Sequence, residues 1–183
     1  MATEALKTTS ITNMDSPTAV QAGMGGQGYM LTVNDHVAST AGVTTGSTYR
    51  MCRIPTNAKV KRVLFSCAAH ATTGSFDVDV AHSDSTTDGT PAPLQGTIPQ
   101  ISAADNKLFG AALSATTALK NSDITFSGTF TTTHQNMELW NVLVALGTTS
   151  FSADPGGFFD ILLKSTATDV TGGDLAIEVD YVC

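Results

Sequence analysis

The chain has 183 residues, which fits one domain or one domain with an arm, and should bury roughly 70% of its unfolded surface without help from disulfides or metal. Only 14% of the residues are charged, against about 25% in a typical globular protein. A surface with so few charges is easily desolvated, as an assembly subunit requires. The net charge of −7 argues against a general nucleic-acid binder, because such proteins gain most of their affinity by neutralising phosphates.

The cysteines and the N-terminus indicate where the protein is made. Cys52, Cys67 and Cys183 form neither a CxxC pair nor an even set, so we expect a reducing compartment, with Cys183 exposed and the other two in the core. The N-terminus lacks the basic start and apolar run of a signal peptide. No stretch approaches the ~20 apolar residues of a membrane span, so we expect a soluble protein.

Residues 1–45 are rich in Thr, Ser, Asn, Ala and Gly and are predicted to form an extended, interface-forming N-terminal arm with one strand at Tyr29 to Val33. Within the arm, Gly23 to Gly28 matches G-x-G-x-x-G, but a dinucleotide site needs a buried strand before this motif and a helix after it. We interpret the match as a glycine loop. Residues 46–183 are predicted to form the β-sandwich domain.

The stretch from Ser47 to Ala68 contains two strand-like runs joined through Pro55-Thr56-Asn57, and we expect them to pair as a hairpin. Its basic residues are the one charge feature above background: Arg50, Arg53, Lys59, Lys61 and Arg62. They fit either a solvated strand face, balanced by Asp77 and Asp79 on a neighbouring strand, or a docking stripe for an acidic protein surface.

Further along the chain, Phe76 to Val80 alternates apolar residues with Asp77 and Asp79, which predicts a strand with one core face and one wet face. Ala81 to Pro99 carries dense turn signals and is expected to form a long surface loop. Leu139, Trp140, Leu143 and Val144 lie at helical spacing, so a helix is predicted over Gln135 to Leu146 and should end at Gly147.

The C-terminal part supplies two more predicted strands, Phe158 to Ser165 and Leu175 to Val182. Several short strands with Gly- and Pro-rich turns and one short helix indicate an all-β fold, a β-sandwich or jelly roll.

No motif in the sequence indicates catalysis or a cofactor. Asp77 and Asp79, with His70 or His82, could hold a divalent ion, although a solvated strand face explains the same spacing. The loop Asp84 to Gly89 departs from the calcium-binding pattern. H-E-x-x-H, G-x-S-x-G and the P-loop are absent from the sequence, so we predict a protein that is not an enzyme. Trp140 is either the anchor of its helix or an interface hot spot.

Several motifs follow one another between about Gly46 and Val182: GSTYR-x-x-RIP-x-NAKVKRV, then DVDV, DITF, an ELW-x-x-LG-like run, DPGGFFDI and LAIEVDYV. Their order resembles small head proteins of tailed bacteriophages, in particular the cement or decoration proteins of short-tailed phages. The resemblance implies a virion protein, made in the bacterial host cytoplasm and often homotrimeric. It would dock on the major capsid protein outside the shell and cement neighbouring capsomers, without binding nucleic acid or membrane directly. The family has no catalytic residues.

The residues expected to contact partners are the basic ones together with the single tryptophan: Arg50, Arg53, Lys59, Lys61, Arg62 and Trp140. The alternative function is a receptor- or glycan-binding β-module of a phage tail or fibre, since jelly rolls also serve as lectins. Aromatic residues make up 7% of the chain, which is thin for stacking on sugars.

Overall fold

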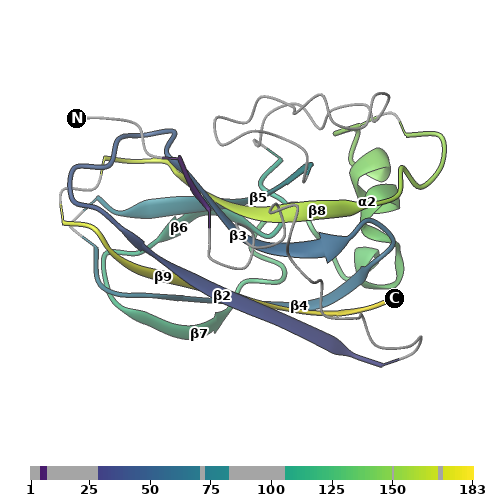
Figure 1. The fold of residues 1–183 in the computed structure, drawn as a ribbon, viewed down its shortest axis with the longest axis horizontal. Coiled ribbons are helices and arrows are strands. Elements are labelled where there is room, and N and C mark those ends of the chain that lie inside the picture. Colours follow the sequence, from purple (N-terminus) through teal and green to yellow (C-terminus); the bar gives the residue numbers. More distant parts are fainter. Residues whose placement is uncertain (1–4, 8–28, 71–72, 83–105, 150, 169–170) are drawn as a thin grey trace, which may run out of the picture.

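The computed structural model describes residues 5–7, 29–70, 73–82, 106–149, 151–168 and 171–183, and it arranges them as two β-sheets packed face to face (Figure 1). The five-stranded sheet contains, in spatial order, β1 (Ala5–Lys7), β3 (Thr48–Pro55), β8 (Phe158–Ser165), β5 (Ser75–His82) and β6 (Gly110–Ser114). The four-stranded sheet contains β2 (Leu31–Ser39), β9 (Gly173–Val182), β4 (Lys59–Cys67) and β7 (Leu119–Asp123). The predicted all-β sandwich is confirmed.

The path of the chain between the sheets defines the topology. From β2 to β9 the strands alternate between the two sheets, except that β5 is followed by its neighbour β6, and every pairing among these strands is antiparallel. The sheet orders β3-β8-β5-β6 and β2-β9-β4-β7 are those of an eight-stranded jelly roll. β1 lies outside this pattern and pairs in parallel with the edge of β3.

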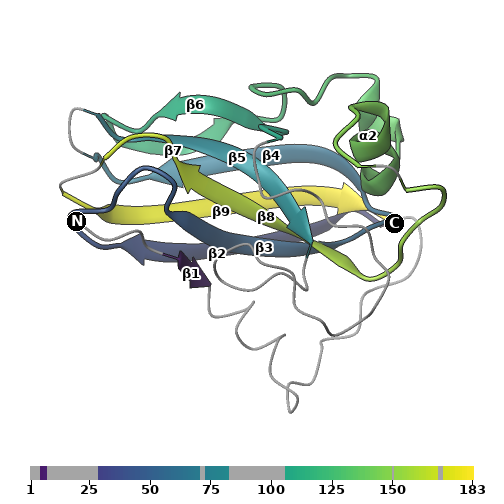
Figure 2. The same cartoon turned by 90° about the horizontal axis from the view of Figure 1, so that it is seen from above.

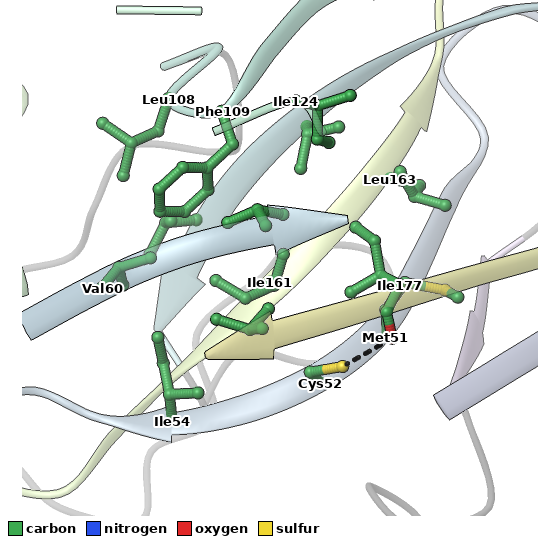
Figure 3. Packing of buried hydrophobic residues seen from close by; sticks show 14 of the residues in the cluster. Met51, Cys52, Ile54, Val60, Leu108, Phe109, Ile124, Ile161, Leu163 and Ile177 are labelled. Atoms are coloured by element: carbon green, nitrogen blue, oxygen red, sulfur yellow. Dashed lines mark hydrogen bonds between the residues drawn. The ribbon is translucent and has the colours of Figure 1, made fainter. Parts of the chain in front are cut away.

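The core lies between the two sheets and follows the period-2 pattern of the strands. In β9 the predicted inward row of Leu175, Ile177, Val179 and Tyr181 is buried. Figure 3 shows Ile177 close to residues of the other sheet, among them Met51, Ile161 and Leu163. Each large apolar side chain buried in this way contributes about 1.5–3 kcal/mol to stability. This continuous apolar layer holds the two sheets together.

The three cysteines are placed as the sequence predicts, with Cys52 and Cys67 buried and Cys183 exposed. The sulfur of Cys52 lies 3.7 Å from the carbonyl oxygen of Ile177 across the core. Burial is the main cause that raises the pKa of the Cys52 thiol far above its ordinary value, and it raises the pKa of Cys67 as well. Both thiols therefore act as small core hydrophobes.

The predicted hairpin between the two strands of the Ser47 to Ala68 stretch is wrong. β3 and β4 lie in opposite sheets, where β3 pairs with β8 and β4 pairs with β9. The connection crosses one end of the sandwich, and the amide of Thr56 donates to the carbonyl of Gly157 over 3.1 Å. The carbonyls of Thr56 and Ala58 accept hydrogen bonds from Trp140 (3.0 Å) and Leu139 (2.8 Å). These partners satisfy the buried backbone of the connection, so it does not need a hairpin ladder.

The helix predicted over Gln135 to Leu146 is present as two pieces, the 3-10 helix η2 (His134–Asn136) and the α-helix α2 (Leu139–Ala145). Leu139, Val142 and Leu143 are buried at helical spacing, and Gly147 follows the helix with a positive φ of 69°. Figure 2 shows α2 at one end of the sandwich. No helix among the described residues is long and apolar enough to cross a membrane.

β2 lies within the segment that the sequence analysis assigned to the arm. The strand expected at Tyr29 to Val33 runs instead from Leu31 to Ser39 and pairs with β9 over all nine residues. The Gly23 to Gly28 motif, the Asp84 to Gly89 loop and most of the surface loop predicted over Ala81 to Pro99 lie outside the described residues.

Candidate partner-binding residues

Arg50 and Arg53 do not lie on a solvated strand face, because both side chains converge on the carboxylate of Asp160 from β8. The Nε of Arg53 lies 2.7 Å from Asp160 Oδ1, and a guanidinium nitrogen of Arg50 is paired with Oδ2. Asp160 is fully buried and Arg50 is 3% exposed. The ladder of β3 with β8 has a register shift between Arg50 and Cys52, so Arg50 and Arg53 share one face although they are three residues apart. With Asp160 they lie on the sheet face opposite the core. Buried charges require such partners, because an uncompensated charge in the interior is strongly destabilising.

Lys61 is bound to the segment before the helix. Its ammonium group donates to the carbonyl of Gln135 over 2.7 Å and to the side-chain oxygen of Asn136 over 3.1 Å. The side-chain amide of Gln135 donates back to the carbonyl of Lys61 over 2.9 Å. These reciprocal bonds fasten η2 to β4. Lys59, at the start of β4, is half-buried.

Arg62 is the most accessible member of the predicted stripe, with half of its side chain exposed. It projects from the outer face of the four-stranded sheet, where a guanidinium nitrogen lies 2.8 Å from Asp180 and 3.7 Å from Glu178. Asp180 also accepts a hydrogen bond of 2.6 Å from the hydroxyl of Thr32. The five basic residues are therefore divided between two sheets, and four of them have internal polar partners.

Trp140 is half-buried and packs against the core from the first turn of α2. Its indole N–H donates to Glu138 over 2.6 Å, while its backbone amide bonds the β3–β4 connection. This placement fits the interpretation of Trp140 as the anchor of its helix. Its use as an interface hot spot stays a prediction.

The wet face expected for Asp77 and Asp79 is wrong, because both side chains are buried. Asp79 accepts a hydrogen bond of 2.5 Å from the amide of Lys107, and Asp77 accepts one of 2.6 Å from the amide of Ala112. Lys107 and Ala112 have left-handed backbones, with φ of 47° and 48°. The carboxylates thus fix an irregular edge strand. Within the part of the chain that the structure describes, no three His, Cys, Asp or Glu residues are grouped to hold a metal.

Two histidines have local structural partners. His70 is buried with its ring 5.3 Å from that of Phe76. His134, the first residue of η2, accepts a hydrogen bond of 3.1 Å from the amide of Thr131. In these positions the imidazoles support packing and a turn.

A groove of about 270 Å³ crosses the outer face of the four-stranded sheet. Side chains from all four of its strands line the groove, among them Asn34, His36, Leu64, Asn121 and Glu178. No local sequence pattern reveals this surface, because its residues come from four strands that lie far apart along the chain.

The comparisons with known proteins concern the fold. No family model matches the sequence, and no curated protein matches it either. A chain of the solved structure "Capsid of Ralstonia phage GP4" is similar with a TM-score of 0.55 and 13% sequence identity, over 97% of each chain. A chain of "Cyanophage Pam1 capsid asymmetric unit" gives a TM-score of 0.47 at 16% identity, over 91% of this chain and 99% of that one.

The protein is thus an all-β sandwich by its fold. Its likeness to the GP4 chain extends over practically the full length of both proteins, so it concerns the whole fold rather than a shared fragment.

Proposed function

We propose that this protein is a structural component of a bacteriophage virion, which binds the outside of the capsid and cements neighbouring capsomers of the DNA-filled head. The observation that carries the proposal is the whole-chain likeness to a chain from the capsid of phage GP4. The motifs between Gly46 and Val182 that resemble phage cement proteins support the same role. Fold alone does not determine function, so the proposal needs a direct test.

Several features of the described residues are compatible with a structural, non-enzymatic role. Several charged side chains that the sequence suggested as candidate sites stabilise the fold. Arg50 and Arg53 are joined by Asp160, and Asp77 and Asp79 hold an edge strand in place. The low charge of the chain makes its surface easy to desolvate in an assembly. Many weak contacts repeated by symmetry can stabilise a shell without any single strong one.

The proposed partners are the phage major capsid protein and further copies of this chain in a homotrimer. Of the predicted contact residues, Lys59, Lys61, Arg62 and Trp140 retain partial exposure. Arg50 and Arg53 are assigned instead to the stability of the subunit, because their guanidinium groups are committed to Asp160.

The decisive experiment compares virions with and without the protein. Heat-induced release of DNA, followed with an intercalating dye, should occur at a lower temperature in virions that lack the protein, and adding back purified protein should restore the midpoint. Identical midpoints would contradict the cementing role. Light scattering on the purified protein tests the trimer separately.

A second experiment tests the contact residues. Replacing Lys59, Lys61 and Arg62 together by Glu should weaken co-sedimentation with shells, and the effect should diminish as salt rises. Lys120→Glu is the control for reversing a cation elsewhere on the same sheet, because Lys120 is exposed on β7. Circular dichroism must show that the triple variant is folded, since Lys61 and Arg62 also make internal bonds. Equal binding of the two variants would remove these residues from the proposed interface.

The groove on the outer sheet face favours glycan binding as a second candidate function. Asn34, Asn121 and Glu178 present amide and carboxylate groups along it, and such groups hydrogen-bond sugar hydroxyls. A glycan array tests this function, with Asn121→Ala as the variant that should lose any signal. A signal that persists in this variant would place sugar binding elsewhere.

A further inference from the structure

Among the residues that the structure describes, β2 is an edge strand, and it has few of the features that usually protect such strands from pairing with another chain. It occupies one end of the four-stranded sheet and runs the length of the sandwich (Figure 1). Its nine residues pair with β9 without a register shift, and its sequence LTVNDHVAS contains no Pro, Gly or Lys. Regular edges of this length are templates for strand addition.

The other edge strands of the described sheets are short, and two of them are irregular. β1 has three residues, while β6 and β7 have five each. The ladders of β6 and β7 with their neighbours both contain a register shift. β2 is therefore the edge at which strand pairing would be most extensive.

One residue of β2 departs from the pattern of its row. Leu31, Val33 and Val37 are partly buried against the core, and Asp35 occupies the same row opposite the buried Ile177. The Asp35 side chain is 14% exposed, and its Oδ1 accepts a hydrogen bond of 2.8 Å from the amide of the next residue, His36. A carboxylate thus stands at a position that the alternation of the strand reserves for an apolar side chain.

Asp35 is also the midpoint of the strand from Leu31 to Ser39. If β2 paired antiparallel with β2 of a second copy over its whole length, the two-fold axis would pass through Asp35. The two carboxylates would then lie directly opposite each other, at the close spacing where like charges are destabilising. Any other register must be shifted by an even number of residues, because only then do the core-facing rows of the two strands stay on the same face. The smallest such shift places Asp35 opposite Val33 or Val37, and two residues of each strand lose their pairing.

We propose that Asp35 prevents two copies of this protein from associating through their β2 edges. The central negative charge excludes the register with the most backbone pairing, and the shifted registers place that charge against an apolar side chain. The device is an inward-pointing charge on an edge strand, one of the ways by which β-proteins avoid edge-to-edge association. It concerns the subunit before assembly and does not depend on the proposed capsid role.

The test removes the charge with little change in shape. Asp35→Asn should self-associate about tenfold or more tightly than the wild type at low salt, measured as concentration-dependent mass by light scattering. Asp35→Glu keeps the charge and is the matched control, which should behave as the wild type does. Hydrogen–deuterium exchange should locate the new protection in residues 31–39. Unchanged mass for Asp35→Asn, or new protection confined to other segments, would overturn the proposal.

A charge-reversal experiment provides a second, independent readout. Asp35→Lys alone should remain as dispersed as the wild type, because two lysines repel each other as two carboxylates do. An equimolar mixture of Asp35→Lys and wild type should associate, because the central pair is then Asp with Lys. The absence of association in the mixture, or association of Asp35→Lys by itself, would show that the opposed charges at this position do not control pairing.

Discussion

Replacing Asp160 by Asn should be among the most damaging single substitutions in this protein. The side chain keeps its shape, but the two buried guanidinium groups of Arg50 and Arg53 lose the anion that they share. Breaking a buried ion pair in this way costs about 3–5 kcal/mol. For a domain of this size each kcal/mol lowers the melting temperature by about 2–4 °C, so Asp160→Asn should melt roughly 6–20 °C below the wild type.

The loss is measured by urea unfolding and by thermal unfolding followed with circular dichroism. Glu178→Gln is the control, because Glu178 also pairs with an arginine, at 3.7 Å from Arg62, but half of the Arg62 side chain is in solvent. An exposed pair of this kind contributes about 0–1 kcal/mol. If the two variants lose similar stability, the Arg50–Asp160–Arg53 cluster is not the buried charge centre inferred from its geometry.

Three further predictions test other parts of the structure. In the native protein a maleimide should modify Cys183 alone, and Cys52 and Cys67 only after unfolding, as counted by mass spectrometry, because Cys183 is exposed and the other two thiols are buried out of reach of the reagent. Gly172→Ala should destabilise the protein more than Gly147→Ala, although both glycines have positive φ. An added Cβ at Gly172 would lie 2.6 Å from the Ser39 carbonyl oxygen, whereas one at Gly147 would meet open space. Equal unfolding midpoints would refute this prediction. A chelator should leave the melting temperature of the isolated subunit unchanged, because Asp77 and Asp79 accept backbone hydrogen bonds, and a lowered temperature would point to a bound cation.

The sequence predicted individual strands better than their partners. The alternation over Leu175 to Val182 and the apolar run over Phe158 to Ser165 correspond closely to β9 and β8, because period-2 patterning directly reports which residues face a core. The same patterning predicted strands on both sides of Pro55 but assigned them to one hairpin. Strand pairing depends on contacts far along the chain, and β3 and β4 find their partners in β8 and β9.

The candidate site was less predictable than the fold, for a related reason. A charged residue at an outward strand position has the same local pattern whether it faces water or a buried partner. Arg50 and Asp160 are 110 positions apart, and Asp79 meets the amide of Lys107 28 positions away. Only the three-dimensional arrangement shows that these charges are internal. The prediction from the sequence therefore placed more of the basic residues on the surface than the structure does.

Because most of the predicted basic residues bind partners within the subunit, their substitution does not report on capsid binding alone. Arg50 and Arg53 share Asp160, Lys61 holds η2, and Arg62 is matched by Asp180, so a substitution at any of these residues acts on folding as well as on a partner. A salt-dependent loss of binding in such a variant can therefore be assigned to the interface only if its unfolding midpoint is unchanged. Lys59, Lys61 and Arg62 are the cations of the predicted stripe that retain exposure, so we expect the salt-dependent part of shell attachment to come from them and the rest from uncharged surface.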